Sequence, residues 1–326
     1  MEHMSRRNFL GFSGGLLAGT GFLFGAPGSA RAAEPDRWPV TVRDSHLRDV
    51  GEKDAWSALR AIGAEGAEVV VEPDFSCPNL FGAAQPYSIA TDDAMKRLRD
   101  DAAARDLRLT ALCMANKFDA APDEEVRLTE RVARAAQALG IPAIRLDVVP
   151  RKIKDPEAFL KFAIAACKRV IDATAETGVR FGIENHGGTT NRVDFLERLF
   201  AGVGSDRLGL TLDTGNFYWF GYPLAQLYDV YTKFAPRAFH THVKSIHYPD
   251  DKQNIQREVG WEYGKYNCPI TEGDIDFKRV VAILRKANYA GDLCIENESL
   301  GKLDTPAQRA ATLAKEIVFL KELRAR

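Results

Sequence analysis

The sequence predicts an α/β protein with one domain, an eight-stranded parallel barrel of the (β/α)₈ class that follows an N-terminal export signal. The first observation is an alternation of short apolar runs with amphipathic helical segments, from which eight strand–helix units can be counted. The second is that three runs end in Glu184, Asp213 and His242, spaced 29 residues apart. That interval fits one strand, one helix and two loops, and the 326 residues are enough for a complete barrel.

Each expected strand is a short run rich in β-branched and other apolar residues. The first ends near Asp44 and His46, and the second ends at Glu72. In chain order the eight runs occupy residues 38–47, 67–72, 107–114, 143–149, 179–184, 208–213, 238–242 and 291–296.

The expected helices carry apolar residues three or four positions apart. Asp155 with Pro156 is a start signal and Gly178 is a stop signal, whereas Gly215 and Asn216 predict a tight turn after Asp213. In chain order the helices occupy residues 52–66, 92–106, 123–140, 155–178, 192–203, 222–235, 276–291 and 305–323.

Two connections between the expected strands and helices are longer than the others. Residues 76–92 are rich in Pro, Gly and Ser, and we expect them to form a loop over the mouth of the barrel. The segment 246–275 is polar and aromatic and separates His242 from the last strand. Because it is too long to be a simple connector, we expect it to act as a lid.

The first 32 residues predict a twin-arginine signal peptide. Arg6 and Arg7 precede a glycine-rich apolar run, and residues 30–32 form an A-x-A cleavage site. A membrane anchor is the alternative, but the run falls short of the roughly 20 residues that span a bilayer. We expect cleavage after Ala32, a barrel over residues 33–326, and a periplasmic protein exported by the twin-arginine machinery. This route carries folded proteins, which suits one that binds its metal before export.

The charge balance argues against a nucleic-acid-binding protein, and the cysteines argue against a protein held by disulfides or a structural zinc ion. The chain has 44 basic and 45 acidic side chains, so no net positive field attracts nucleic acid. The five cysteines are odd in number and lack C-x-x-C spacing, which predicts buried thiols instead of disulfides or a structural zinc site.

Four polar groups stand at the ends of the last four strands: Glu184, Asp213, His242 and Glu296. A parallel barrel brings these ends to one mouth. One acid at a strand end is more often a helix cap than a ligand, but burying three acids together without a cation is costly. The oxygen-rich set suits one divalent cation, Mn²⁺ or Mg²⁺ first, with Co²⁺ or Zn²⁺ as alternatives.

Several residues near this mouth are candidates for substrate contact. His240 and His242 share one side of their strand, and His242 lies nearer its C-terminal end. We therefore expect His242 as the ligand and His240 in the layer behind it, with an exchange of the two roles as the alternative. The full set of expected contact residues is His186, His240, Lys244, Glu72, Asn116 and Trp261. The alternatives are a solvated rim charge for Lys244, a turn residue for His186 and a packing aromatic for Trp261.

Four stretches carry a resemblance to a known family: IENHGG, LTLDTGN, HTHVKS and GDIDFKRVVAILRKANYAGDLCIENE. They resemble the sugar phosphate isomerase/epimerase family, the xylose-isomerase-like TIM barrels that include hydroxypyruvate isomerase and ketose 3-epimerases. The resemblance covers the mature chain and is strongest over residues 178–299. It implies that Glu184, Asp213, His242 and Glu296 hold the metal, and that Glu184 and Glu296 are the acid/base pair. Where many members have Asp after the lysine, this chain has Ser245, so the substrate contacts there stay open.

These observations predict a divalent-metal-dependent isomerase or epimerase that works through an enediolate. Because export is expected and phosphorylated sugars are mainly cytoplasmic, the substrate is expected to be a non-phosphorylated sugar or sugar derivative. A lyase that performs β-elimination on a keto-glycoside and a non-catalytic sugar-binding barrel are the alternatives. A nuclease of this barrel type would need a richer set of histidines than the six present. A homo-oligomer is expected only by analogy with the family.

Overall fold

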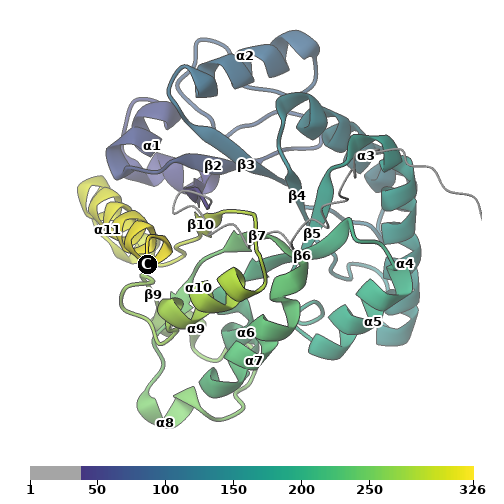
Figure 1. Ribbon diagram of the computed structural model, residues 1–326, viewed down its shortest axis with the longest axis vertical. Coiled ribbons are helices and arrows are strands. Elements are labelled where there is room, and N and C mark those ends of the chain that lie inside the picture. Colours follow the sequence, from purple (N-terminus) through teal and green to yellow (C-terminus); the bar gives the residue numbers. More distant parts are fainter. Residues whose placement is uncertain (1–37) are drawn as a thin grey trace, which may run out of the picture. The chain divides into compact units, whose positions relative to one another are not determined.

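The computed structural model describes residues 38–326, in which eight parallel strands form a barrel surrounded by helices (Figure 1). Strands β1 to β7 pair in chain order, and β10 pairs with β1. A backbone bridge closes the ring, because Val243 N donates to Cys294 O at 2.7 Å and Glu296 N donates to Val243 O at 3.1 Å. The predicted (β/α)₈ barrel is confirmed. Its strands are β1 (Val40–Arg43), β2 (Gly66–Val70), β3 (Arg108–Cys113), β4 (Ala143–Leu146), β5 (Arg180–Glu184), β6 (Leu208–Asp213), β7 (Ala238–His242) and β10 (Leu293–Ile295).

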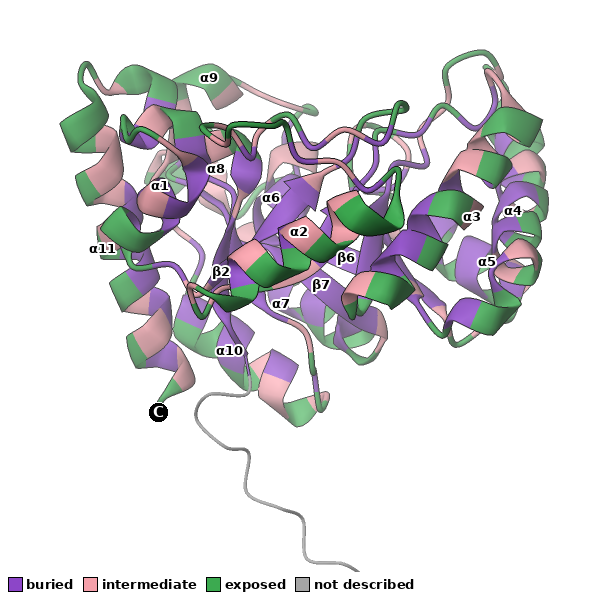
Figure 2. Cartoon of the chain, turned by 90° about the horizontal axis from the view of Figure 1, so that it is seen from above, coloured by how far each residue is buried: buried purple, intermediate pink, exposed green. Residues whose placement is uncertain are grey.

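The outer ring of helices buries one face of each helix against the strands and exposes the other (Figure 2). Local signals fix their ends: Asp155 accepts a hydrogen bond from Ala158 N at the start of α4, and Thr305 with Gln308 forms a capping box on α11. These helices are α1 (Ala55–Ile62), α2 (Asp92–Ala103), α3 (Pro122–Leu139), α4 (Pro156–Ala173), α5 (Val193–Val203), α7 (Leu224–Phe234), α10 (Phe277–Lys286) and α11 (Pro306–Arg324).

Short 3-10 helices join several of these elements: η1 (Asp44–Val50), η2 (Ala175–Thr177), η3 (Ala235–Arg237) and η4 (Leu300–Lys302). From residue 38 onward, no helix combines the length and the apolar character needed to cross a bilayer. The signal peptide expected in residues 1–32 lies outside the described residues.

The structure corrects two local expectations. The first strand ends at Arg43, since Asp44 already begins η1, where its buried carboxylate accepts from Val70 N and Asn79 Nδ2, both at 3.0 Å. The expected turn after Asp213 is instead a short helix, α6 (Thr214–Phe220). It forms because Asp213 Oδ1 accepts from the backbone N of residues 215 and 216, both at 2.8 Å, and so caps the helix.

The long segment between β7 and β10 is docked onto the barrel. It contains α8 (Asp250–Gln253) and α9 (Tyr263–Tyr266), and its β9 (Asn267–Cys268) pairs antiparallel with β8 (Ser245–Ile246). Buried Arg257 anchors it, since Nη2 donates to Tyr218 O at 2.9 Å and to Tyr222 O at 3.0 Å. Tyr263 of α9 reaches the mouth of the barrel, where it lines the cavity described below.

Candidate metal centre at the mouth of the barrel

Four side chains from neighbouring strands meet at the C-terminal end of the barrel. Glu184 ends β5, Asp213 ends β6, His242 ends β7 and Glu296 directly follows β10. One donor atom from each lies within 4.8 Å of the others, and all four residues are buried. Parallel pairing explains the convergence, because the ends of successive strands reach the same rim.

A cavity of about 310 Å³ lies over this cluster. Glu184 and Glu296 form part of its wall, and it falls in the lower part of the size range of small-molecule sites, about 300–1,000 Å³. Its other lining residues are Arg43, Arg145, His186, Gly187, Asn216, Trp219, Lys244, Tyr263 and Glu298.

His242 presents one nitrogen to the acidic cluster and the other to the barrel interior. Nδ1 lies 3.4 Å from Glu184 Oε1 and 3.5 Å from Glu296 Oε2, and it has no hydrogen-bond partner in the described part of the chain. Nε2 lies 3.0 Å from Glu68 Oε1. Burial lowers the pKa of His242, but Glu68, Glu296 and Glu184 outweigh it and raise that pKa to about 9. A buried imidazole nitrogen that has no hydrogen-bond partner and lies beside two carboxylates fits a cation site, in which a metal would displace its proton.

Asp213 directs one oxygen to helix α6 and the other to the acidic cluster. Oδ1 caps α6, whereas Oδ2 accepts no hydrogen bond among residues 38–326, although Lys244 Nζ lies 3.0 Å away. Burial raises the pKa of Asp213 well above its usual value. The donor set of three carboxylates and one imidazole, with no thiolate, fits Mg²⁺, Mn²⁺ or Zn²⁺.

Two arginines each bind one carboxylate oxygen of Glu184 or Glu296. Arg145 Nε donates to Glu184 Oε2 at 2.5 Å, and Arg43 pairs with Glu296 Oε1. Although burial opposes ionisation, Arg145 and then His242 hold the pKa of Glu184 below its usual range. Lys244 and Arg43 do the same for the pKa of Glu296. Both glutamates are therefore ionised and able to act as ligands or bases.

Sequence reasoning did not single out either arginine as a site residue. Arg145 lies two residues before Asp147 on an inward-facing side of β4, and that alternation is the signal that could have found it. Arg43 is the last residue of β1 and carries no comparable pattern.

Lys244 belongs to the interior of the cavity and is not a solvated rim charge. It is buried, and its Nζ lies 3.0 Å from Asp213 Oδ2, 3.0 Å from Glu296 Oε2 and 3.1 Å from Glu298 Oε1. Gly215 makes room for it, because a Cβ there would lie 2.4 Å from Lys244 Cγ. The ammonium thus partly neutralises the acidic cluster.

The other expected contact residues divide into two groups. His186 lines the cavity, with Nδ1 3.1 Å from Asp147 Oδ1, a hydrogen bond that raises the pKa of His186. His240 is buried behind His242 and does not line the cavity. Glu72, Asn116 and Trp261 do not line it either.

Local structure explains why Glu72, Asn116 and Trp261 lie outside the cavity. Glu72 is exposed in a turn, since β2 already ends at Val70. Asn116 Nδ2 donates to Glu125 Oε2 at 2.9 Å, toward α3. Trp261 stacks on Tyr266 within its own segment, with ring centroids 5.5 Å apart. Trp219 of α6 and Tyr263 of α9 supply the aromatic lining instead.

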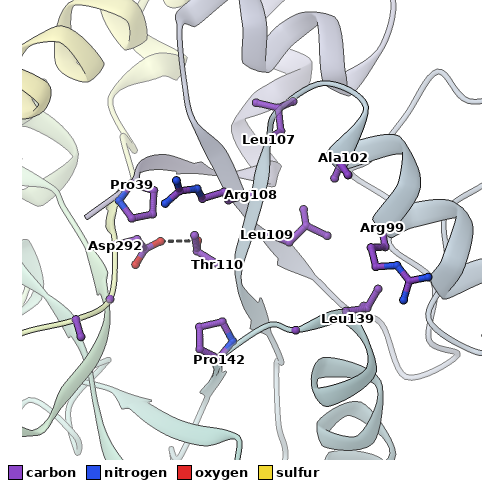
Figure 3. Close-up of a pocket in the computed structure, with 14 residues that line it drawn as sticks. Pro39, Arg99, Ala102, Leu107, Arg108, Leu109, Thr110, Leu139, Pro142 and Asp292 are labelled. Carbon is purple, nitrogen blue, oxygen red and sulfur yellow. Dashed lines mark hydrogen bonds between the residues drawn. The ribbon is translucent and has the colours of Figure 1, made fainter. Parts of the chain in front are cut away.

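A second cavity, about 410 Å³, lies at the opposite end of the barrel, where the strands begin (Figure 3). It is larger, but its walls are mostly apolar, with Pro39, Leu107, Leu109 and Leu139 among them. Asp292 faces Thr110 at its edge, and the two share a hydrogen bond of 2.5 Å. The four converging donors all belong to the other end.

The family model of the xylose isomerase-like TIM barrel matches residues 56–323. The chain belongs to this family. The resemblance expected from the four sequence motifs is confirmed. This xylose isomerase-like barrel is 27% identical to the inosose dehydratase of Klebsiella pneumoniae over 148 residues, which cover 44% of the chain and 49% of that relative. The chain thus spans about half the length of the curated relatives it matches.

Solved structures share the fold of this xylose isomerase-like barrel over most of its length. A xylose isomerase-like TIM barrel protein from Mycobacterium smegmatis in complex with magnesium is 15% identical, with a TM-score of 0.65, and the match covers 89% of this chain and 98% of that one. D-allulose 3-epimerase from Methylomonas sp. in complex with D-allulose is 14% identical, with a TM-score of 0.60, and the match covers 88% and 97%. At these identities the likeness shows the fold alone.

Proposed function

We propose that this protein is a divalent-metal-dependent isomerase or epimerase that moves a proton at a carbon next to the carbonyl of a non-phosphorylated sugar or sugar derivative. The observation that carries the proposal is the convergence of Glu184, Asp213, His242 and Glu296 beneath a cavity that Glu184 and Glu296 both line. The magnesium-bound and D-allulose-bound structures of the same fold support a metal and a sugar as ligands.

The two glutamates supply the proton transfers. A divalent cation held by the four side chains would place positive charge beside the carbonyl oxygen, which acidifies the adjacent C–H and stabilises the enediolate of the substrate. Glu184, ionised beside Arg145, removes the proton. Glu296 reaches the cavity from another strand, so it can return a proton to the opposite face or to the next carbon. The first outcome is epimerisation and the second is aldose–ketose exchange.

The cavity supports a neutral, single-ring substrate. Trp219 and Tyr263 offer aromatic surfaces to the apolar faces of a sugar. Within residues 38–326, the Lys and Arg side chains that line the cavity are Arg43, Arg145 and Lys244, and each is already paired with a carboxylate. A phosphate group would need a cation without such a partner.

Solvent deuterium exchange tests the proposal. We expect the Mn²⁺-loaded protein to introduce deuterium at a carbon next to the carbonyl of at least one sugar in a panel of neutral and oxidised ketoses. Chelation, Glu184→Gln and Glu296→Gln should each lower exchange at least a hundredfold. Glu72→Gln is the matched control, because that acid is exposed and lies outside the cavity. Unchanged exchange in both glutamate variants would refute the pair, and metal-dependent binding without exchange would indicate a sugar-binding protein.

A β-eliminating lyase is the second candidate. The inosose dehydratases among the relatives favour it, and so does Lys244, whose ammonium lies 3.0 Å from Glu296 Oε2 and could protonate a leaving oxygen. A lyase would yield an unsaturated ketone with new ultraviolet absorbance and release water or an alcohol, whereas an isomerase or epimerase would do neither.

We also propose that the mature protein is periplasmic, on the strength of the paired Arg6 and Arg7 and the A-x-A site. N-terminal sequencing of the exported protein should give Ala33 as the first residue. Replacing both arginines with lysine should abolish export, and a protein that stays cytoplasmic with residues 1–32 intact would contradict the proposal.

A further inference from the structure

A row of buried charged residues runs through the barrel behind the metal centre. Glu68 of β2 lies next to His242, His240 lies next to Glu68, and Asp292 lies next to His240. Each of the four is at most 1% exposed. Barrel interiors are usually filled by branched apolar side chains, and buried charge is costly unless it is fully paired.

Glu68 can only accept hydrogen bonds where it stands. Its Oε2 accepts from Arg43 Nε at 2.9 Å, and arginine has no acceptor atom. Its Oε1 lies 3.0 Å from His242 Nε2 and 3.2 Å from His240 Nε2. Both imidazoles must therefore present an N–H to Glu68. In the neutral form of His242, the form that binds a metal, a hydrogen on Nε2 leaves Nδ1 with a free lone pair, and Nδ1 is the nitrogen that faces Glu184 and Glu296.

Asp292 completes the row at the other end of the barrel. Its Oδ1 lies 2.6 Å from His240 Nδ1, and its Oδ2 accepts from Thr41 Oγ1 at 2.7 Å. Oδ2 also accepts from Thr110 Oγ1 at 2.5 Å (Figure 3). With three donors around it, Asp292 is fixed, and so is the ring of His240. His240 then holds Glu68 Oε1 in the position where it meets His242.

We propose that Glu68 is a positioning residue for the metal centre: it keeps His242 in the tautomer whose Nδ1 can bind a cation, and the His240–Asp292 pair braces Glu68 from behind. This inference rests on the proposed metal centre and adds to it a residue that touches neither the cation nor the substrate. Carboxylates that accept from a metal-bound histidine typically change metal affinity 10–100-fold when replaced.

Glu68→Gln is the sharpest test because it preserves shape and reverses one hydrogen bond. The amide of Gln must turn its oxygen to Arg43, so its NH₂ faces both imidazoles. His242 would then have to accept at Nε2 and carry its hydrogen on Nδ1, the nitrogen needed for the cation. We expect the Mn²⁺ affinity of the mature protein, measured by competition with a chelating dye, to fall 10–100-fold.

Two further variants separate positioning from a general loss of stability. Glu68→Asp keeps an acceptor-only group, so its affinity should lie between those of the wild type and Glu68→Gln. Glu125→Gln is the control, because Glu125 accepts from Asn116 and is not one of the four donors or a partner of His242. Its Mn²⁺ affinity should match the wild type, and metal-free Glu68→Gln should keep the circular dichroism spectrum of the folded wild type at the temperature of the titration.

Nitrogen-15 NMR of the metal-free proteins above pH 9, where the imidazole of His242 is neutral, reads the tautomer directly. We expect the hydrogen of His242 on Nε2 in the wild type and on Nδ1 in Glu68→Gln. Equal Mn²⁺ affinity in the two proteins, or an unchanged tautomer, would overturn the inference. A wild type that binds Mn²⁺ but catalyses nothing would overturn only the proposed reaction, since affinity and tautomer are measured without substrate. A wild type that binds no divalent ion would overturn both.

Discussion

Arg145 divides the two oxygens of Glu184 between two tasks. Its Nε donates to Oε2 at 2.5 Å, whereas Oε1 accepts from Asn216 Nδ2 at 3.1 Å and lies 3.4 Å from His242 Nδ1. The arginine thus keeps the carboxylate ionised and directs one oxygen toward the proposed metal.

Replacing this arginine should shift the pH dependence of activity. Without Arg145 the pKa of buried Glu184 rises, so the acid limb of the pH–rate profile for Arg145→Gln should move to higher pH. Breaking a buried ion pair should also lower the free energy of unfolding at neutral pH by about 3–5 kcal/mol. This contribution requires the ionised carboxylate, so in the wild type it is present above the unfolded-state pKa of Glu and is lost as pH falls through the lower folded-state value. Arg151→Gln, at a half-exposed arginine that pairs with Asp147, is the control.

Lys244 should compete with the metal for the carboxylates. Its ammonium lies 3.0 Å from both Asp213 Oδ2 and Glu296 Oε2, so removing the charge relieves repulsion of a divalent ion. We expect Lys244→Met to bind Mn²⁺ at least tenfold more tightly and to turn over more slowly. Titration of the metal-free protein measures this, with exposed Lys265→Met as the control. Weaker binding by Lys244→Met would mean that the lysine supports the centre and does not compete with it.

Metal should stabilise the folded protein by mass action. At a Mn²⁺ concentration of 100 times Kd, the free energy of unfolding should increase by about 2.7 kcal/mol. For a chain of this size that corresponds to about 4 °C in Tm. Asp213→Asn should lose most of this increase because it removes one of the four donors. Differential scanning calorimetry with and without chelator gives the comparison, and an equal response in Asp213→Asn would contradict the assigned donor set.

Glu316 on α11 should make stability depend on pH away from the site. Burial raises its pKa to about 7, against hydrogen bonds from Asn297 Nδ2 at 3.0 Å and Ile270 N at 2.8 Å. A raised pKa favours the protonated form in the fold, so this contribution is complete below the unfolded-state pKa and disappears as pH rises through about 7. Glu316→Gln should remove this pH dependence, so the unfolding free energy of the variant minus that of the wild type should rise by on the order of 3 kcal/mol from pH 5 to pH 8. Urea unfolding at pH 5 and pH 8 gives the unfolding free energies of both proteins. The same change in free energy between the two pH values in the variant and the wild type would refute the prediction.

The sequence predicted the barrel and the four converging donors because both follow from periodicity. Alternating strands and helices require a parallel sheet, and strand ends then meet at one rim, which brings Glu184 and Asp213 together. The side chains around them depend on interactions that no local pattern records. Arg43 and Glu68 come from strands without a motif, and Trp219 comes from α6, a helix that exists because Asp213 caps it.

Loop residues were the least predictable for a related reason. Trp261 and Tyr263 are close neighbours in one segment, and only the docking of that segment decides which of them reaches the cavity. Glu72 was placed at a strand end that lies two residues earlier in the structure, so its side chain falls in a turn.

Asp213 Oδ1 caps α6, and this limits how Asp213 can bind an ion. With Oδ1 engaged by two amides, Asp213 can serve only as a monodentate ligand, and the arginines impose the same limit on Glu184 and Glu296. Together with His242 these residues would offer four donor atoms to a bound divalent ion, and Mg²⁺ takes six ligands. A substrate able to chelate through adjacent keto and hydroxyl oxygens would complete that set, and an isolated ketone would not.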